Sequence, residues 1–139
     1  MRSGRKPSAM AVAKPRLVHF DTNFLVDVGA AEPATVQRVE AWLRDDFTLQ
    51  VSATAWSEFV CGPLTDSELT YARSLVHSVD AFTEEHASLA GKLFNLSGRR
   101  HRSHVDCMIA AHAIRREAIL ATANTADFRV FQKFGLQLA

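Results

Sequence analysis

Short apolar runs alternate with segments of helical periodicity along most of the chain. The runs "LVHF" from Leu17, "FTLQVS" from Phe47, "VDAF" from Val79 and "AILAT" from Ala118 predict strands. Between the runs, apolar residues recur at helical spacing, as they do in residues 33–44. This alternation predicts an α/β fold, a three-layer α/β/α sandwich with a central, mainly parallel sheet.

Polar capping residues set the expected helix boundaries. We expect residues 23–30, "NFLVDVGA", to form a loop that leads into a helix beginning near Pro33. The last residues of the chain predict a short helix and an edge strand. The other helices are expected to begin after capping residues: Ser52, Thr65 with Glu68 in a capping box, Thr83, and Ser103 with Asp106 three residues later.

Charge is distributed unevenly along the 139 residues. Residues 1–16 hold five basic side chains and no acid, and we expect them to form a disordered extension before a single domain at residues 17–139. The rest of the chain carries 11 basic and 15 acidic side chains, which makes it mildly acidic. A basic field over the whole surface is therefore excluded, and a nucleic acid would have to bind a local patch.

Hydropathy and cysteine content predict the compartment. No apolar run approaches the roughly 20 residues that a membrane-spanning helix needs, so we expect no membrane association. Cys61 and Cys107 are far apart and form no CxxC pair, which favours a reducing compartment. We therefore expect a cytoplasmic protein in which both cysteines are small buried hydrophobic side chains.

Acidic and amide side chains follow the predicted strands. In a parallel sheet the carboxyl ends of the strands share one edge, where ligands bind. Each of these side chains alone also fits a turn, a cap or an exposed helix position. Carboxylates crowded at one edge repel one another unless they share a cation, and oxygen donors of this kind suit Mg²⁺ or Mn²⁺. The candidate ligands and catalytic residues are Asp21, Glu58, Asp106, Asn124 and Asp127.

A basic loop, "RRHRSH", precedes Asp106. Cationic side chains beside a metal-binding carboxylate suit phosphodiester hydrolysis, because they neutralise the phosphates of a nucleic acid. An ordinary solvated loop is the simpler interpretation of such a charge run. The candidate residues in this loop for binding the phosphates of a nucleic acid are Arg99, Arg100, Arg102 and His104.

Other chemistries find little support in the residue spacing. Zinc fits poorly, because the six histidines form no HExxH motif and no Cys/His ligand spacing. His112, in an apolar helical stretch, is interpreted as a core histidine with its hydrogen bonds satisfied. No GxSxG, GxxxxGK[ST] or GxGxxG motif is present, which argues against a serine nucleophile and against nucleotide binding.

Four segments in this order resemble the PIN-domain ribonucleases, and among them the VapC toxins of toxin–antitoxin systems. They are "FDTNFLVD", "SATAWSEFVCG" with Glu58, "SHVDCMIAAHAI" with Asp106, and "LATANTADF". The resemblance covers residues 17–139 and implies a PIN-like sandwich with Mg²⁺- or Mn²⁺-dependent endoribonuclease activity on RNA. It further implies a homodimer that a cognate antitoxin protein holds inactive.

The resemblance also implies roles for individual residues. Asp21, Glu58 and Asp106 correspond to the metal ligands of the family, and Thr22 would support them by hydrogen bonding. At the fourth family position Asn124 replaces an acid, which leaves open whether Asn124 or Asp127 completes the site and whether one metal ion or two bind. Candidates for an antitoxin-binding groove near Glu58 are Trp42, Trp56, Phe59, Leu64 and Tyr71.

Two alternatives remain open at this point. The absence of an acid at Asn124 also fits a catalytically weak or inactive PIN-like module that binds RNA or a partner protein. A third interpretation, an aspartyl-phosphate enzyme with Asp21 as nucleophile, fits poorly. Such enzymes place a second acid two residues later, where this chain has Asn23.

Overall fold

The computed structural model describes residues 16–99 and 104–139. Its centre is a five-stranded sheet in the order β3-β2-β1-β4-β5, and every neighbouring pair of strands is parallel. The predicted α/β/α sandwich is therefore confirmed. The expected disorder of residues 1–15, and the cap at Ser103, lie outside the described residues. The strands are β1 (Leu17–Phe20), β2 (Thr48–Ser52), β3 (Ser78–Asp80), β4 (Ile119–Ala121) and β5 (Gln137–Leu138).

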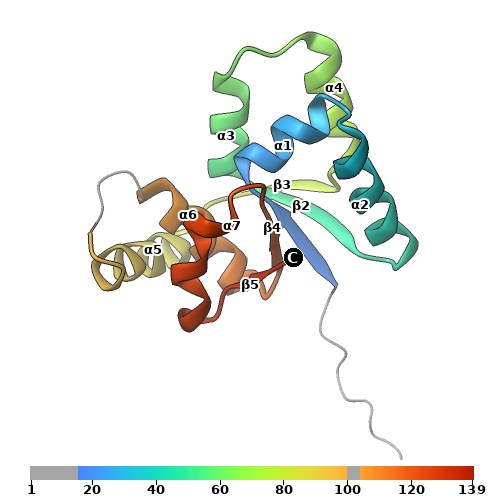
Figure 1. The fold of residues 1–139 in the computed structure, drawn as a ribbon. Coiled ribbons are helices and arrows are strands. Elements are labelled where there is room, and N and C mark those ends of the chain that lie inside the picture. The colour runs from blue at the N-terminus through green and yellow to red at the C-terminus, as the bar shows by residue number, and fades with distance from the viewer. Residues whose placement is uncertain (1–15, 100–103) are drawn as a thin grey trace, which may run out of the picture.

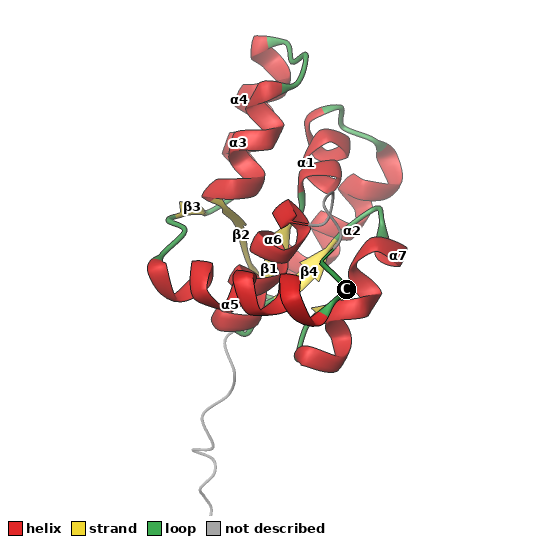
Figure 2. Cartoon of the chain, turned by 90° about the vertical axis from the view of Figure 1, so that its left-hand side faces the viewer, coloured by secondary structure: helices red, strands yellow, loops and turns green. Residues whose placement is uncertain are grey.

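Helices cover both faces of the sheet (Figure 1). The helices α1 (Thr22–Gly29) and α2 (Pro33–Arg44) lie on one side, and α5 (Glu84–Leu96) and α6 (His104–Arg116) pack together on the other. The pair α3 (Ala53–Cys61) and α4 (Asp66–Leu75) projects beyond the sheet (Figure 2). Near the C-terminus, α7 (Thr125–Phe128) continues into the 3₁₀ helix η3 (Arg129–Phe134), which precedes β5.

The alternation of side chains along β1 divides the interior into two different halves. Phe20 points to the α1–α2 side, where its ring lies 4.8 Å from that of Phe24 and 6.3 Å from that of Trp42. His19 points to the other side, where its ring lies 5.0 Å from that of His112 on α6. Successive residues of a strand face opposite sides of a sheet, so one layer is aromatic and the other contains buried imidazoles.

The first helix corrects the expected loop at residues 23–30. These residues belong to α1, which begins immediately after β1 because the Asp21 side chain accepts a hydrogen bond from the Phe24 backbone N–H and caps the helix. Gly29 lies where this helix approaches its neighbours, since a Cβ there would meet the Glu68 carbonyl and the Phe59 ring at 3.4 Å. An apolar sequence with a late glycine therefore concealed a capped and closely packed helix.

The remaining boundaries agree with the capping residues. Ser52 caps α3, Thr65 and Glu68 form the expected capping box of α4, and Thr83 caps α5. The third strand begins one residue earlier than expected and ends at Asp80. The cysteine prediction is half correct, because Cys107 is buried whereas Cys61 is exposed.

No helix among the described residues is both long and apolar enough to span a membrane.

Candidate functional site

The carboxyl ends of β1 and β4 lie side by side and form the centre of the site. Phe20 pairs with Ala121 in the parallel ladder, and the Asp21 backbone N–H donates to the Ala121 carbonyl at 3.0 Å. Asp21 and Thr122 are therefore neighbours at the same edge of the sheet, and the Thr122 hydroxyl donates a short hydrogen bond to Asp21 Oδ2. The pairing of two strands far apart in sequence fixes this carboxylate.

Asp21 has a structural role and also lines the site. Its Oδ1 atom accepts from the Phe24 N–H at 2.8 Å, and its side chain is almost completely buried. Burial raises the pKa of Asp21, and the nearby Glu58 and Asp27 carboxylates raise it further, whereas the hydrogen bonds from Thr122 and Phe24 lower it. The helix cap holds a carboxylate whose charge is costly unless a cation shares it.

A cleft of about 240 Å³ opens beside Asp21 and collects the predicted acids. At roughly 30 Å³ per water, this volume accommodates a hydrated ion and a phosphate group. We call it the acidic cleft. The residues that line it are Asp21, Thr22, Asn23, Glu58, Asp106, Ile109, Asn124, Asp127 and Phe128.

Glu58 reaches the acidic cleft from α3, the helix after β2. The Thr22 hydroxyl, at the start of α1, donates to Glu58 Oε1 at 2.6 Å. This is the kind of hydrogen bond expected of Thr22 from the sequence. Because Glu58 itself is exposed, the bond restricts a side chain that would otherwise sample several rotamers in solvent.

Asp106 shows the clearest electrostatic signature of the acidic cleft. It lies in the first turn of α6, half-buried, and no described residue donates a hydrogen bond to its side chain. Burial, together with the nearby carboxylates of Asp127, Glu58 and Asp21, raises the pKa of Asp106 to about 6. Among the described residues that line the cleft, none is basic. This donor set of four carboxylates fits a hard divalent cation such as Mg²⁺ or Mn²⁺.

Both candidates for the fourth family position line the acidic cleft. The Asn124 backbone N–H donates to the Thr122 hydroxyl oxygen at 2.9 Å, and the Asp127 N–H donates to the Asn124 carbonyl at 3.1 Å. Both side chains are exposed. Asp127 contributes charge, because its carboxylate is the nearby charge that raises the pKa of Asp106 most. The geometry therefore includes both residues and does not select one.

Sequence reasoning missed Thr122. It was assigned only to a motif, whereas the structure shows that its hydroxyl binds Asp21 and also accepts from Asn124. A signal was available, because Thr122 is the last residue of the predicted fourth strand and so lies at the same sheet edge as Asp21. In the basic loop, Arg99 and His104 are exposed, and the rings of His104 and Phe94 meet edge to face at 5.6 Å. Arg100 and Arg102 lie outside the described residues.

The fold and the site together define a class of protein. It is a parallel α/β/α sandwich with an acidic cleft, suited to a divalent cation, at the carboxyl edge of the sheet. The family model of the PIN domain matches residues 18–133, and the chain therefore belongs to the PIN-domain family. PIN domains are generally nucleases. No protein of curated function matches the sequence.

Solved structures share the fold. VapBC2 from Rickettsia felis, bound to a DNA fragment from its promoter, matches with a TM-score of 0.70 and 18% identity over 88% of this chain and 97% of that chain. VapBC-1 from nontypeable Haemophilus influenzae matches with a TM-score of 0.68 and 20% identity, over 88% of this chain and 96% of that chain. DNA-bound VapBC from Salmonella typhimurium matches with a TM-score of 0.65 and 17% identity, over 89% of this chain and 97% of that chain.

Proposed function

We propose that this protein is a Mg²⁺- or Mn²⁺-dependent endoribonuclease and the toxin of a VapBC-like toxin–antitoxin system. The observation that carries the proposal is the acidic cleft, which Asp21, Glu58, Asp106 and Asp127 line and to which no basic side chain of residues 16–99 and 104–139 contributes. Membership of a family whose members are generally nucleases supports the reaction class. The similarity to VapBC structures supports the biological role.

The carboxylates of the acidic cleft would hold the metal ion from different elements of the fold. Asp21, held by Thr122 and by the first turn of α1, offers a fixed oxygen at the base of the cleft. Glu58, oriented by Thr22, and Asp106, which has no described hydrogen-bond donor, offer oxygens from the opposite helices. A bound Mg²⁺ supplies charge that neutralises a phosphodiester and lowers the pKa of a water molecule.

The basic loop is the proposed binding site for the RNA backbone. Arg99 is exposed at the end of α5 and His104 is exposed at the start of α6, so both side chains can meet phosphates. The Arg99 guanidinium bonds to Asn95 Oδ1 and lies 5.7 Å from the centre of the Phe94 ring. Contacts of this type bind single strands without reading sequence, so specificity must come from elsewhere.

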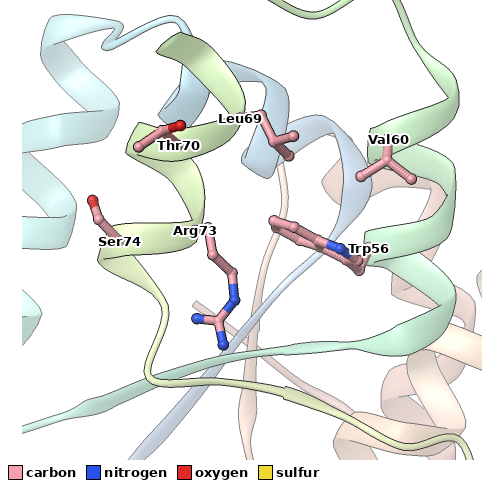
Figure 3. A pocket seen from close by; sticks show the side chains of 6 residues that line it. All are labelled: Trp56, Val60, Leu69, Thr70, Arg73 and Ser74. Atoms are coloured by element: carbon pink, nitrogen blue, oxygen red, sulfur yellow. The ribbon is translucent and has the colours of Figure 1, made fainter. Parts of the chain in front are cut away.

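An apolar groove between α3 and α4 is the proposed contact for a cognate antitoxin. Trp56 and Leu69 face each other across it, and Arg73 closes one end (Figure 3). The groove lies on the helix that carries Glu58, so a partner seated there would reach the acidic cleft. Of the earlier candidates only Trp56 lines it, because Phe59 is buried and Trp42 packs against Phe24. We also propose a homodimer that acts in the cytoplasm.

The direct experiment is RNA cleavage by the purified full chain with Mg²⁺. We expect wild type to cleave total RNA and a chelator to stop it, whereas Asp21→Asn cleaves at least about 100-fold more slowly because it loses a charged ligand. Asp66→Asn, an exposed acid outside the acidic cleft, is the matched control and should cleave like wild type. Full activity of a folded Asp21→Asn protein would contradict the proposal.

The second candidate function is an inactive PIN-like module that binds RNA or a partner protein. Asn124 favours it, because an amide at this position brings no charge to the acidic cleft. Calorimetric titration with Mn²⁺ separates the two functions. The nuclease should bind Mn²⁺ in a manner that depends on Asp106, whereas RNA binding without Mn²⁺ binding would favour the inactive module.

A further inference from the structure

Three elements bring a second set of metal-binding side chains together on the α5–α6 side of the sheet. His19 on β1, Asp80 at the end of β3 and His112 on α6 each present a ligand atom, and these atoms lie within 4.8 Å of one another. The distance from His19 Nε2 to Asp80 Oδ2 is 3.7 Å. We call this set the histidine cluster. No residue of the histidine cluster lines the acidic cleft.

Several ligand atoms of the histidine cluster lack hydrogen-bond partners. Among the described residues, no group bonds to Asp80 Oδ2 or to either ring nitrogen of His112, although all three atoms are buried. His112 is fully buried, and buried polar atoms in folded proteins nearly always have a partner. A shared cation satisfies Asp80 Oδ2 and one His112 nitrogen in a single step.

The surroundings hold the His112 ring in position. His86 stacks on it with ring centres 3.9 Å apart and planes inclined by 27°. His86 is itself fixed, because its Nδ1 accepts from the Thr83 backbone N–H at the start of α5. Burial lowers the pKa of His112 to about 3, so the ring is neutral and keeps a lone pair for coordination.

Two polar neighbours compete with a bound ion. Gln50 Oε1 lies 3.0 Å from His19 Nε2, and the same oxygen accepts from Arg116 at 3.3 Å, so it keeps a donor when His19 turns to a metal. The Arg116 guanidinium is 3.8 Å from Asp80 Oδ2, which gives an ion pair but no hydrogen bond. Its charge opposes a cation, but the side chain is 40% exposed and can move into solvent.

We propose that His19, Asp80 and His112 form a second metal site, which binds one imidazole-preferring divalent transition-metal ion of the Zn²⁺ type. A donor set of two imidazoles and one carboxylate binds Zn²⁺, Co²⁺ or Fe²⁺ in preference to Mg²⁺. Ligand atoms of one tetrahedral Zn²⁺ are about 3.4 Å apart at bond lengths of about 2.0–2.1 Å. The measured 3.7 Å between His19 and Asp80 therefore needs only a small adjustment.

Such an ion would stabilise the framework that carries the acidic cleft. It would join β1, the short edge strand β3 and α6, which come from distant parts of the sequence. His19 precedes Asp21 by two residues on β1, and His112 follows Asp106 on α6. The role is structural and does not depend on the proposed nuclease activity.

The test is titration of the chelator-treated full chain with Co²⁺, followed by visible absorption and by the thermal midpoint. The exposed Cys61 is changed to Ser in every sample, because a surface thiol binds these ions adventitiously. In excess Mg²⁺, which would occupy the acidic cleft, we expect one equivalent of Co²⁺ with d–d bands, displacement by Zn²⁺ and a higher thermal midpoint. Asp80→Asn should weaken binding about tenfold or more, whereas Asp66→Asn, which neutralises an exposed acid outside the histidine cluster, should leave it unchanged.

A double variant, Asp21→Asn with Asp106→Asn, separates this proposal from the proposed nuclease function. It should keep the Co²⁺ bands and the thermal shift while losing any Mg²⁺-dependent cleavage. The proposal is overturned if wild type takes up no Co²⁺, if Asp80→Asn binds it as tightly as wild type, or if the double variant loses the bands. His112→Leu should lose the Co²⁺ bands as well. If that variant does not fold, Asp80→Asn, which keeps the size of the side chain, tests whether the histidine cluster binds Co²⁺.

Discussion

The acidic cleft and the histidine cluster are built on the same two elements but contain opposite chemistry. His19 lies on β1 and Asp21 follows the last residue of that strand, whereas Asp106 and His112 both lie on α6. The carboxylates lie at the edge of the sheet, where part of their charge reaches solvent. The imidazoles lie within the sandwich, where they are neutral. Depth along a single strand–helix pair thus separates hard oxygen donors from softer nitrogen donors.

The two regions should respond to acid in opposite directions. Burial lowers the pKa of His112 and of His19, so each ring contributes stability above its unfolded pKa that is lost as the pH falls. The raised pKa of Asp106 does the reverse, because its contribution to stability is fully present below the usual value of 3.8 and is lost as the pH rises to about 6.

Replacement of His112 by Leu should flatten the loss of stability in acid. Wild type must keep the ring neutral while the unfolded chain protonates it near pH 6.5, which costs about 2–3 kcal/mol at pH 4. Urea unfolding in chelator at about pH 7 and pH 4 measures this difference. His104→Leu, at an exposed histidine, should behave like wild type, and a His112→Leu profile as steep as wild type would show that the buried ring does not cause the effect.

Removal of the Thr122 hydroxyl should damage the acidic cleft alone. Thr122→Ala deletes the hydrogen bond to Asp21, and losses of this kind reduce metal affinity or activity about 10–100-fold. Cleavage rates at several Mg²⁺ concentrations measure the effect, which more Mg²⁺ should partly restore. Thr122→Ser keeps the hydroxyl and should stay close to wild type. Equal rates for Thr122→Ala and wild type would mean that Asp21 needs no such support.

Neutralising Asp106 should stabilise the metal-free protein. At about pH 7 its charge is unfavourable in the folded state, so Asp106→Asn should gain about 1–2 kcal/mol once solvent screening is allowed for. The gain should vanish at about pH 4, where the wild-type side chain is protonated. Denaturant unfolding in chelator measures both values, and a gain that persists at low pH would rule out charge repulsion as the cause.

The smallest effect is expected from Arg99. Arg99→Ala should lower the slope of RNA affinity against salt by about 0.7, the value for one phosphate contact on a single strand. Binding titrations at several salt concentrations measure the slope, with Arg44→Ala on α2 as an exposed control. An unchanged slope would remove Arg99 from the RNA contact.

The acidic cleft was predictable because its residues follow strands. Asp21 comes directly after one predicted strand and Asn124 comes shortly after another, and a parallel sheet places such positions at one edge. Thr122 escaped notice, because only the pairing of β1 with β4 shows that it adjoins Asp21. The helix over residues 22–29 was not predicted, because the apolar run after Asp21, with its late glycine, was interpreted as a loop.

The histidine cluster could not be found from spacing. His19, Asp80 and His112 belong to three elements separated by 32 to 61 positions, and no ligand motif spans them. His112 was interpreted as a core histidine with satisfied hydrogen bonds, and the structure corrects this. It is buried as expected, but neither ring nitrogen has a partner among the described residues. Burial followed from the apolar periodicity, whereas its unpartnered nitrogens required three-dimensional coordinates.

The central claim is that the carboxylates of the acidic cleft perform metal-dependent RNA hydrolysis. The most direct measurement compares wild type with Asp106→Asn in the cleavage of total RNA with Mg²⁺, after circular dichroism shows that both are folded. We predict cleavage at discrete positions by wild type and none above background by Asp106→Asn. Equal cleavage by the two proteins would contradict the claim.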